Sequence, residues 1–148
     1  FHTMASGGLG YSLPASVGIA LAKPDRRVVC VIGDGSLMYS LQALWTAVQQ
    51  RLNLTVIVLN NGGYGALRSF AQVLQMQRAP GFELPGLDFV ALAKGLGCEG
   101  RRIERPGEIA GTLDDALNHR GPYLLDVAVD PSVPMLYIEM FWVPTFAT

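Results

Sequence analysis

The chain has 148 residues, of which half are hydrophobic and 16% are charged, and its formal net charge is −1. This length fits one domain with a substantial core. The sequence has no basic block, which argues against nucleic acid as a partner, and no apolar run approaches the roughly 20 residues that span a bilayer. The low charged fraction fits either a well-buried α/β sheet or, as we favour, extra apolar surface that meets another domain or subunit.

Helical and extended patterns alternate along the first half of the chain, which is typical of a parallel sheet with helices on both faces. Two continuous apolar runs predict strands that are buried on both faces. Apolar residues at helical spacing predict a single long helix between them. The expected elements are a glycine loop at 6–10, a helix from about 14 to 22, a strand at 27–32, a helix at 37–51 and a strand at 54–59.

The second half continues the alternation and ends in an apolar tail. The expected elements are a helix at about 64–76, an irregular stretch at 77–86, a helix at 89–94 with Asp88 as its N-cap, a strand near 99–103, a helix at 106–119 and a strand at 123–129. We therefore expect one α/β domain over residues 1–132, a three-layer α/β/α sandwich with a mainly parallel sheet. Residues 133–148 form either a frayed terminus or, as we favour, a docking segment or lid.

Polar residues follow two neighbouring strands of this sheet. Gly33-Asp34-Gly35 comes after the first strand and Asn60-Asn61 after the second. In a βαβ unit the carboxyl ends of both strands meet at one edge, where open α/β folds bind ligands. A carboxylate, an amide oxygen and a nearby carbonyl, for which we select Gly63, suit Mg²⁺, and the turn heads a helix whose dipole favours phosphate.

This combination resembles the signature of thiamine-diphosphate-dependent enzymes. Within that family, three segments are similar to the benzoylformate decarboxylases: residues 7–15 (GGLGYSLPA), 32–36 (IGDGS) and 60–68 (NNGGYGALR). The resemblance covers roughly residues 5 to 130 and corresponds to the C-terminal, diphosphate-binding domain. It implies a thiamine-diphosphate-binding fold and a non-oxidative 2-oxo acid decarboxylase with thiamine diphosphate and Mg²⁺ as cofactors.

The resemblance also implies roles for individual residues. Asp34 and Asn61 would bind Mg²⁺ through their side chains and Gly63 through its carbonyl. Leu9 would support the bent cofactor, although it could be an ordinary loop anchor. The residues expected to contact the cofactor are Gly7, Gly8, Leu9, Gly33, Asp34, Gly35, Ser36, Asn61, Gly63, Tyr64, Gly65 and Ala66. Ala66, Leu67 and Phe70 would line the substrate pocket, with simple core packing an equal alternative for Leu67 and Phe70.

No residue of this chain matches the family's activating glutamate or its proton-transferring histidines. The catalytic residues are therefore unknown and expected outside the chain, on a pyrimidine-binding domain that belongs to a second subunit of a homodimer or homotetramer. The chain opens abruptly at Phe1 beside the glycine loop, which favours a piece of a longer enzyme. We also expect Gly63 to loosen its loop, because relatives often have threonine there.

The sequence also leaves alternative functions open. An acetolactate-synthase-like carboligase would share these motifs and use FAD on a domain absent here, and a noncatalytic Mg²⁺–nucleotide-binding module could use the same kind of sheet. A phosphatase of the haloacid dehalogenase type needs a second Asp two residues after the first, but position 36 is Ser. Cys30 and Cys98 lie in or beside expected strands as core residues, so a reducing cytoplasm is the expected location.

Overall fold

The computed structural model describes residues 7–76 and 80–132. Its four strands are all parallel and form one sheet in the order β1-β2-β4-β3. The strands are β1 (Val28–Gly33), β2 (Leu54–Asn60), β3 (Glu99–Ile103) and β4 (Tyr123–Ala128). The predicted strands are therefore confirmed to within a residue or so at each end, because unbroken runs of branched apolar residues favour this buried position.

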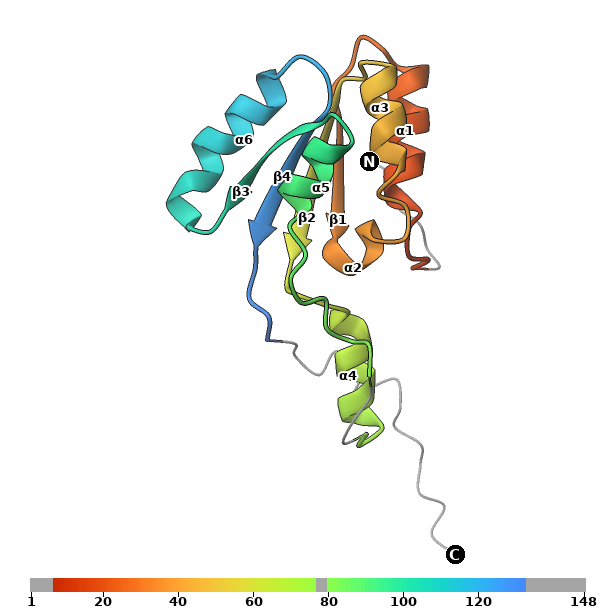
Figure 1. Ribbon diagram of the computed structural model, residues 1–148, viewed down its shortest axis with the longest axis vertical. Helices are drawn as coiled ribbons and strands as arrows, with labels where there is room; N and C mark the ends of the chain where they lie inside the picture. The colour runs from red at the N-terminus through yellow and green to blue at the C-terminus, as the bar shows by residue number, and fades with distance from the viewer. Residues whose placement is uncertain (1–6, 77–79, 133–148) are drawn as a thin grey trace, which may run out of the picture.

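Helices cover both faces of the sheet, as Figure 1 shows. One face packs against α1 (Ser12–Ala22), α3 (Ala43–Gln49) and α5 (Phe89–Gly95), and the other against α6 (Ile109–Asn118). The predicted three-layer α/β/α architecture is confirmed. Two further helices, α2 (Asp34–Leu37) and α4 (Gly65–Val73), follow the carboxyl ends of β1 and β2.

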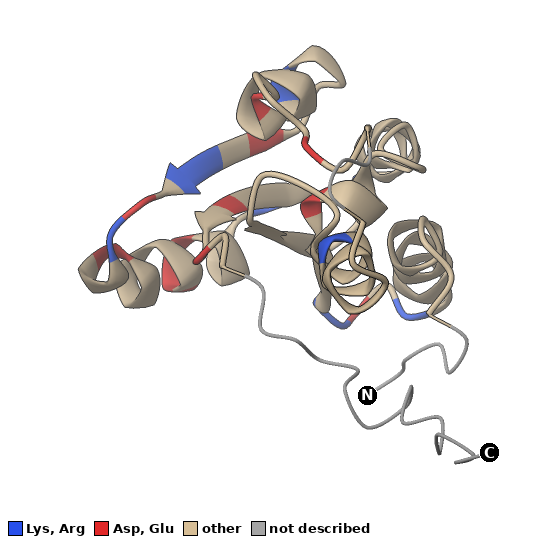
Figure 2. Cartoon of the chain, turned by 90° about the horizontal axis from the view of Figure 1, so that it is seen from below, with Lys and Arg blue, Asp and Glu red and all other residues tan. Residues whose placement is uncertain are grey.

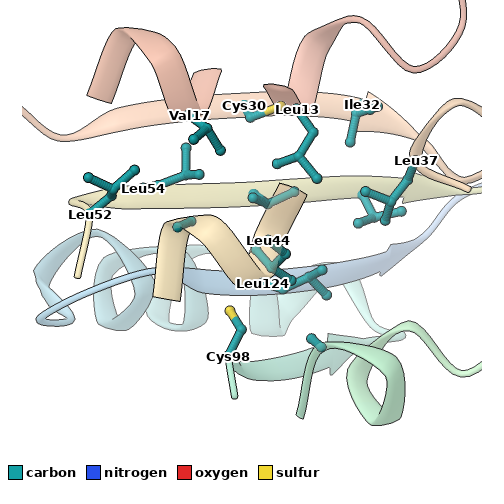
Figure 3. Close-up of a cluster of buried hydrophobic side chains, with 14 of the residues drawn as sticks. Leu13, Val17, Cys30, Ile32, Leu37, Leu44, Leu52, Leu54, Cys98 and Leu124 are labelled. Carbon is teal, nitrogen blue, oxygen red and sulfur yellow. The ribbon is translucent and has the colours of Figure 1, made fainter. Parts of the chain in front are cut away.

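The main hydrophobic core lies between the sheet and the layer formed by α1, α3 and α5 (Figure 3). It includes Leu13 and Val17 from α1, Leu44 from α3 and Leu124 from β4. Both cysteines, Cys30 and Cys98, are buried in it and unpaired, as predicted. A smaller cluster on the other face joins α6 to β3 and β4.

The long helix expected over 37–51 is wrong. The structure has the short helix α2, a turn over 38–42 and then α3. Hydrogen bonds from Ser40 N to Leu37 O and from Ala43 N to Ser40 O, both i to i−3, tighten this turn. Leu37 and Leu44 are both buried in the core, whereas Trp45 is 54% exposed. Likewise, the helix expected over 106–119 begins with a 3-10 turn, Pro106–Glu108, before α6.

Part of the sheet lies outside the cover of α6, which packs on β3 and β4. Val31 of β1 is 56% exposed, and Val29 and Leu59 are also exposed. Acidic and basic residues are scattered over several elements (Figure 2). Within the described ranges, no helix is long and apolar enough to cross a membrane. The expected tail, 133–148, lies outside the described residues.

Candidate cofactor and metal site

The two polar motifs meet at the carboxyl edge of the sheet. Gly33, the last residue of β1, pairs with Leu59 near the end of β2, so Asp34 and Asn61 leave the sheet side by side. Asp34 is buried although it carries a carboxylate. Its Oδ1 accepts a hydrogen bond from the N–H of Gly35 at 2.8 Å, and its Oδ2 accepts one from the N–H of Gly63 at 2.9 Å. The motif after β1 thus holds the loop after β2.

The carboxamide of Asn61 completes a cluster of oxygens. Its side-chain oxygen faces Asp34 Oδ1 and the carbonyl oxygen of Gly63, and both of these atoms only accept hydrogen bonds. Turned round, the amide would instead donate to the same two atoms, at 3.2 and 2.8 Å. Oxygens that face one another so closely repel unless a cation lies among them or the amide turns.

The dimensions of this cluster fit magnesium. Octahedral Mg²⁺ holds its oxygen ligands at about 2.1 Å, so neighbouring ligands lie about 3 Å apart. The separations of 3.2 Å to Asp34 and 2.8 Å to Gly63 suit hydrogen bonds from the Asn61 nitrogen and equally suit shared coordination of Mg²⁺ through its oxygen. One carboxylate, one amide and one carbonyl would leave room for phosphate oxygens and water, which Mg²⁺ commonly retains. The residues present therefore fit a magnesium–diphosphate group.

The glycine loop before α1 reaches the same edge. The N–H of Gly10 donates to the Ser36 hydroxyl oxygen at 3.0 Å, which joins the loop to the turn after Asp34. Gly7 and Gly10 have φ angles of 62° and 82°, a left-handed conformation that favours glycine. Leu9 is 47% exposed. An apolar side chain is thus presented to solvent beside the oxygen cluster, where it could contact a ligand.

The backbone of Gly35 lies directly beneath the ring of Tyr64. A Cβ atom at position 35 would lie 2.6 Å from two Tyr64 ring carbons, so only glycine fits without a shift. The Tyr64 ring also makes an edge contact with Tyr39. Desolvation raises the pKa of the Tyr64 hydroxyl, and the nearby Tyr39 and Asp34 add to that rise. The N–H of Gly35 is bound to Asp34, so Gly35 would serve a diphosphate by making room.

The residues expected to line a substrate pocket follow on α4. Figure 1 shows this helix beyond the carboxyl ends of the strands, away from the main body of the sheet. Gly65 begins the helix, Ala66 is exposed, Leu67 is 42% exposed and Phe70 is half-buried. Neither Leu67 nor Phe70 belongs to the buried clusters. Both alternatives for Leu67 and Phe70 therefore stay predictions, and within the described residues Leu67 contributes apolar surface that faces outward from α4.

Sequence reasoning missed a second, buried polar group behind the site. Asp126 of β4 is fully buried, and it accepts hydrogen bonds from Asn60 Nδ2 at 2.9 Å and from Arg102 Nη1 at 2.6 Å. The side-chain oxygen of Asn60 in turn accepts from the N–H of Gly62 at 3.1 Å. This chain of contacts links three strands to the loop that carries Asn61. A single acidic residue in the apolar run YLLDVA was the available signal.

Comparison with known proteins agrees with this geometry. The family model described as the C-terminal TPP binding domain of thiamine pyrophosphate enzymes matches residues 1–127. The chain belongs to this family. It is 48% identical over 130 residues to benzoylformate decarboxylase of Pseudomonas aeruginosa, which covers 88% of the chain and 25% of that protein. It is 38% identical over 125 residues to the large subunit of acetolactate synthase isozyme 2 of Escherichia coli, with 84% and 23% covered.

Two solved structures share the fold. The benzoylformate decarboxylase of Polynucleobacter necessarius superposes with a TM-score of 0.87 at 39% identity, over 92% of this chain and 26% of that one. The thiamine-diphosphate-dependent 4-hydroxybenzoylformate decarboxylase of Rhodococcus jostii RHA1 gives 0.80 at 44% identity, over 88% and 24%. The chain spans about a quarter of the length of the curated relatives that it matches. The resemblance to thiamine-diphosphate enzymes seen in the sequence is confirmed.

Proposed function

We propose that this chain is the cofactor-binding domain of a thiamine-diphosphate- and Mg²⁺-dependent 2-oxo acid decarboxylase of the benzoylformate type. The observation that carries the proposal is the convergence of the Asp34 carboxylate, the Asn61 carboxamide and the Gly63 carbonyl at one edge of the sheet, because these are oxygen-bearing groups that suit Mg²⁺. When bound, thiamine diphosphate supplies the electron sink that allows a 2-oxo acid to lose CO₂. The chain's own residues bind and orient that cofactor.

Each part of the edge has a separate task in this proposal. Asp34, Asn61 and the Gly63 carbonyl hold Mg²⁺, while Gly35 and Ser36 accommodate the diphosphate. Leu9, with Gly7 and Gly8, supports the organic part of the cofactor, and its exposure leaves it free to do so. Gly33, Tyr64, Gly65 and Ala66 border the diphosphate. Ala66, Leu67 and Phe70 provide the apolar wall on which an aryl substituent of the substrate rests.

The groups that activate the cofactor and transfer protons lie on another domain in this proposal. The exposed apolar side chains at the edge, including Leu9, Tyr39 and Leu67, support a partner surface because such a cluster is costly in water. We assign that partner as a pyrimidine-binding domain from a second subunit of a homodimer or homotetramer. The two unpaired, buried cysteines support a cytoplasmic location.

A carboligase of the acetolactate synthase type is the second candidate, because several relatives carry that name at 34 to 38% identity. The identity of 48% to a benzoylformate decarboxylase favours the decarboxylase. Product analysis separates the two. The full-length enzyme with benzoylformate should release CO₂ and an aldehyde, whereas condensation of two 2-oxo acids into one acid would select the carboligase.

The test of cofactor binding uses Asp34→Ala in the full-length enzyme that carries this sequence. We expect this variant to lose Mg²⁺-dependent retention of thiamine diphosphate on gel filtration, because the metal loses its carboxylate. Asp25→Ala, an exposed acidic residue between α1 and β1, is the matched control and should retain the cofactor as the unmodified enzyme does. Unchanged retention in Asp34→Ala would contradict the assignment, and a preference for ADP over thiamine diphosphate would select a nucleotide-binding module. The 148-residue chain alone should show no turnover.

A further inference from the structure

Arg68 of α4 lies directly behind the loop formed by residues 61–63. Its Nη2 donates to the carbonyl of Gly62 at 3.0 Å, and its Nη1 donates to the carbonyl of Asn61 at 3.4 Å. Only 16% of its side chain is exposed, although it carries a full charge. A guanidinium presents five donors in a rigid fork, so a single side chain can bind several carbonyls of one loop at once.

An acidic residue holds the guanidinium in this place. Glu83 accepts from Arg68 Nε at 2.9 Å and pairs with Nη2 through its second oxygen. Glu83 also forms an isolated antiparallel bridge with Gly63. On either side of Glu83, Tyr64 N donates to Phe82 O at 2.8 Å, and Leu84 N donates to Gly62 O at 3.0 Å. The loop is therefore bound on one side by α4 and on the other by the segment 82–84.

The same contacts explain why position 63 is glycine. A Cβ atom there would lie 2.4 Å from Arg68 Nη2 and 2.2 Å from the carbonyl oxygen of Phe82. The guanidinium and the 82–84 segment thus occupy the space that a side chain would need. The expected loosening of this loop by glycine is wrong, because Gly63 is closely packed and its N–H is bound to Asp34.

We propose that Arg68, oriented by Glu83, is a positioning residue for the metal. This inference rests on the proposed function, since it concerns the same magnesium site. Arg68 binds the carbonyls of Asn61 and Gly62, and the structure gives it no hydrogen bond to the three clustered oxygens. It therefore acts by fixing the backbone from which the Asn61 amide and the Gly63 carbonyl project. Mg²⁺ tolerates little departure from octahedral geometry, so the loop's conformation controls its affinity.

The test measures metal binding directly in the full-length apoenzyme. Mn²⁺ serves as the probe, and electron paramagnetic resonance reports the free ion at saturating thiamine diphosphate. We expect Arg68→Met to raise the Mn²⁺ dissociation constant about 10-fold, within the range found when residues that support metal ligands are removed. Arg68→Lys keeps the positive charge but lacks the forked guanidinium, so its Mn²⁺ dissociation constant should lie between those of the unmodified enzyme and Arg68→Met. Arg105→Met removes another arginine paired with a glutamate, Glu108, outside the loop, and should leave the constant unchanged.

Two further variants make the result decisive. Asp34→Ala tests the proposed function, so a normal Mn²⁺ affinity in that variant would overturn the site itself. If Asp34→Ala loses binding while Arg68→Met keeps full affinity, only the role of Arg68 is overturned. If Arg68→Met has fewer Mn²⁺ sites per protein but an unchanged dissociation constant, part of the protein is unfolded and the folded part binds normally. That result would also overturn the positioning role. If Arg68→Met does not fold, Glu83→Gln provides the test, because the Glu83 side chain is 67% exposed and its change is less disruptive. We expect this variant to bind Mn²⁺ more weakly than the unmodified enzyme.

Discussion

Substitution of Asp126, whose carboxylate is buried in the sheet, tests how the sheet supports the site. Replacing it with leucine removes two hydrogen bonds, one from Asn60 and one from Arg102. A hydrogen bond to a charged group contributes about 1.5–3 kcal/mol, so the gross loss is about 3–6 kcal/mol. The desolvation penalty of the buried carboxylate disappears at the same time, which offsets part of the loss.

The partners of Asp126 differ in how easily they find new contacts. The Arg102 side chain is 44% exposed and also pairs with Glu104, so it can turn to water. Asn60 is only partly exposed, and its amide nitrogen would lose its carboxylate partner. We therefore expect Asp126→Leu to lower the free energy of unfolding by about 2–4 kcal/mol, less than the full cost of breaking an enclosed ion pair. Asp126→Asn keeps one neutral hydrogen bond and should cost about 1–2 kcal/mol.

Urea unfolding of the apoprotein, followed by circular dichroism, measures these differences. Glu108→Gln removes another carboxylate that pairs with an arginine, on the surface, and should leave the unfolding midpoint unchanged. The order of stability should be unmodified protein, then Asp126→Asn, then Asp126→Leu. A leucine variant that is as stable as the unmodified protein would refute the reasoning, because the buried pair would then contribute nothing beyond the packing of its atoms.

Two further outcomes test the burial of specific groups. Desolvation, with help from the Glu99 charge, raises the pKa of the Cys98 thiol to about 12, so the folded state keeps this proton while the unfolded chain loses it near pH 9. The free energy of unfolding should therefore fall as pH rises from 9 towards 12, and this thiol should contribute about 1.4 kcal/mol per pH unit to the fall. Urea unfolding of Cys98→Ala over the same pH range should show a correspondingly smaller fall. Gly35→Ala should destabilise the protein by about 1–3 kcal/mol because its Cβ meets the Tyr64 ring. Gly18→Ala, in α1 with open space around it, is the control and should stabilise the protein by about 0.5–1 kcal/mol. Equal effects of the two variants in thermal unfolding would contradict the packing at position 35.

The sequence was sufficient to predict the meeting of Asp34 and Asn61. Both residues directly follow continuous apolar runs, and parallel strands bring such positions to one edge regardless of the details of packing. The Asp88 N-cap was equally local, and its carboxylate accepts from Ala91 N at 2.8 Å. Features that follow from local sequence, or from the topology of a parallel sheet, are therefore predictable without a structure.

Features that depend on tertiary packing were not accessible in this way. The spacing of Leu37, Leu44 and Trp45 suits one continuous helix, but i to i−3 hydrogen bonds divide the stretch into α2, a turn and α3, and Trp45 is exposed. Position 63 differs from the expectation for a similar reason. A glycine commonly allows backbone freedom, but the Arg68 guanidinium from α4 and the Phe82 carbonyl, 19 residues further along the chain, fill the space beside Gly63.

The hydrogen bonds at the carboxyl edge have a consistent direction. The Asp34 carboxylate accepts N–H groups from Gly35 and Gly63, while the carbonyls of Asn61 and Gly62 are bound from behind by Arg68. These contacts come from the chain itself and leave the clustered oxygens of Asp34, Asn61 and Gly63 facing one another. With its nitrogen turned toward them, the Asn61 amide donates to Asp34 Oδ1 and to the Gly63 carbonyl, and with its oxygen turned inward the same three groups could ligate a cation after little rearrangement. Under the proposed function, these contacts would hold the three metal-binding groups in place before Mg²⁺ arrives, and the exposed Leu9 and Leu67 would meet the organic part of the cofactor and a partner domain.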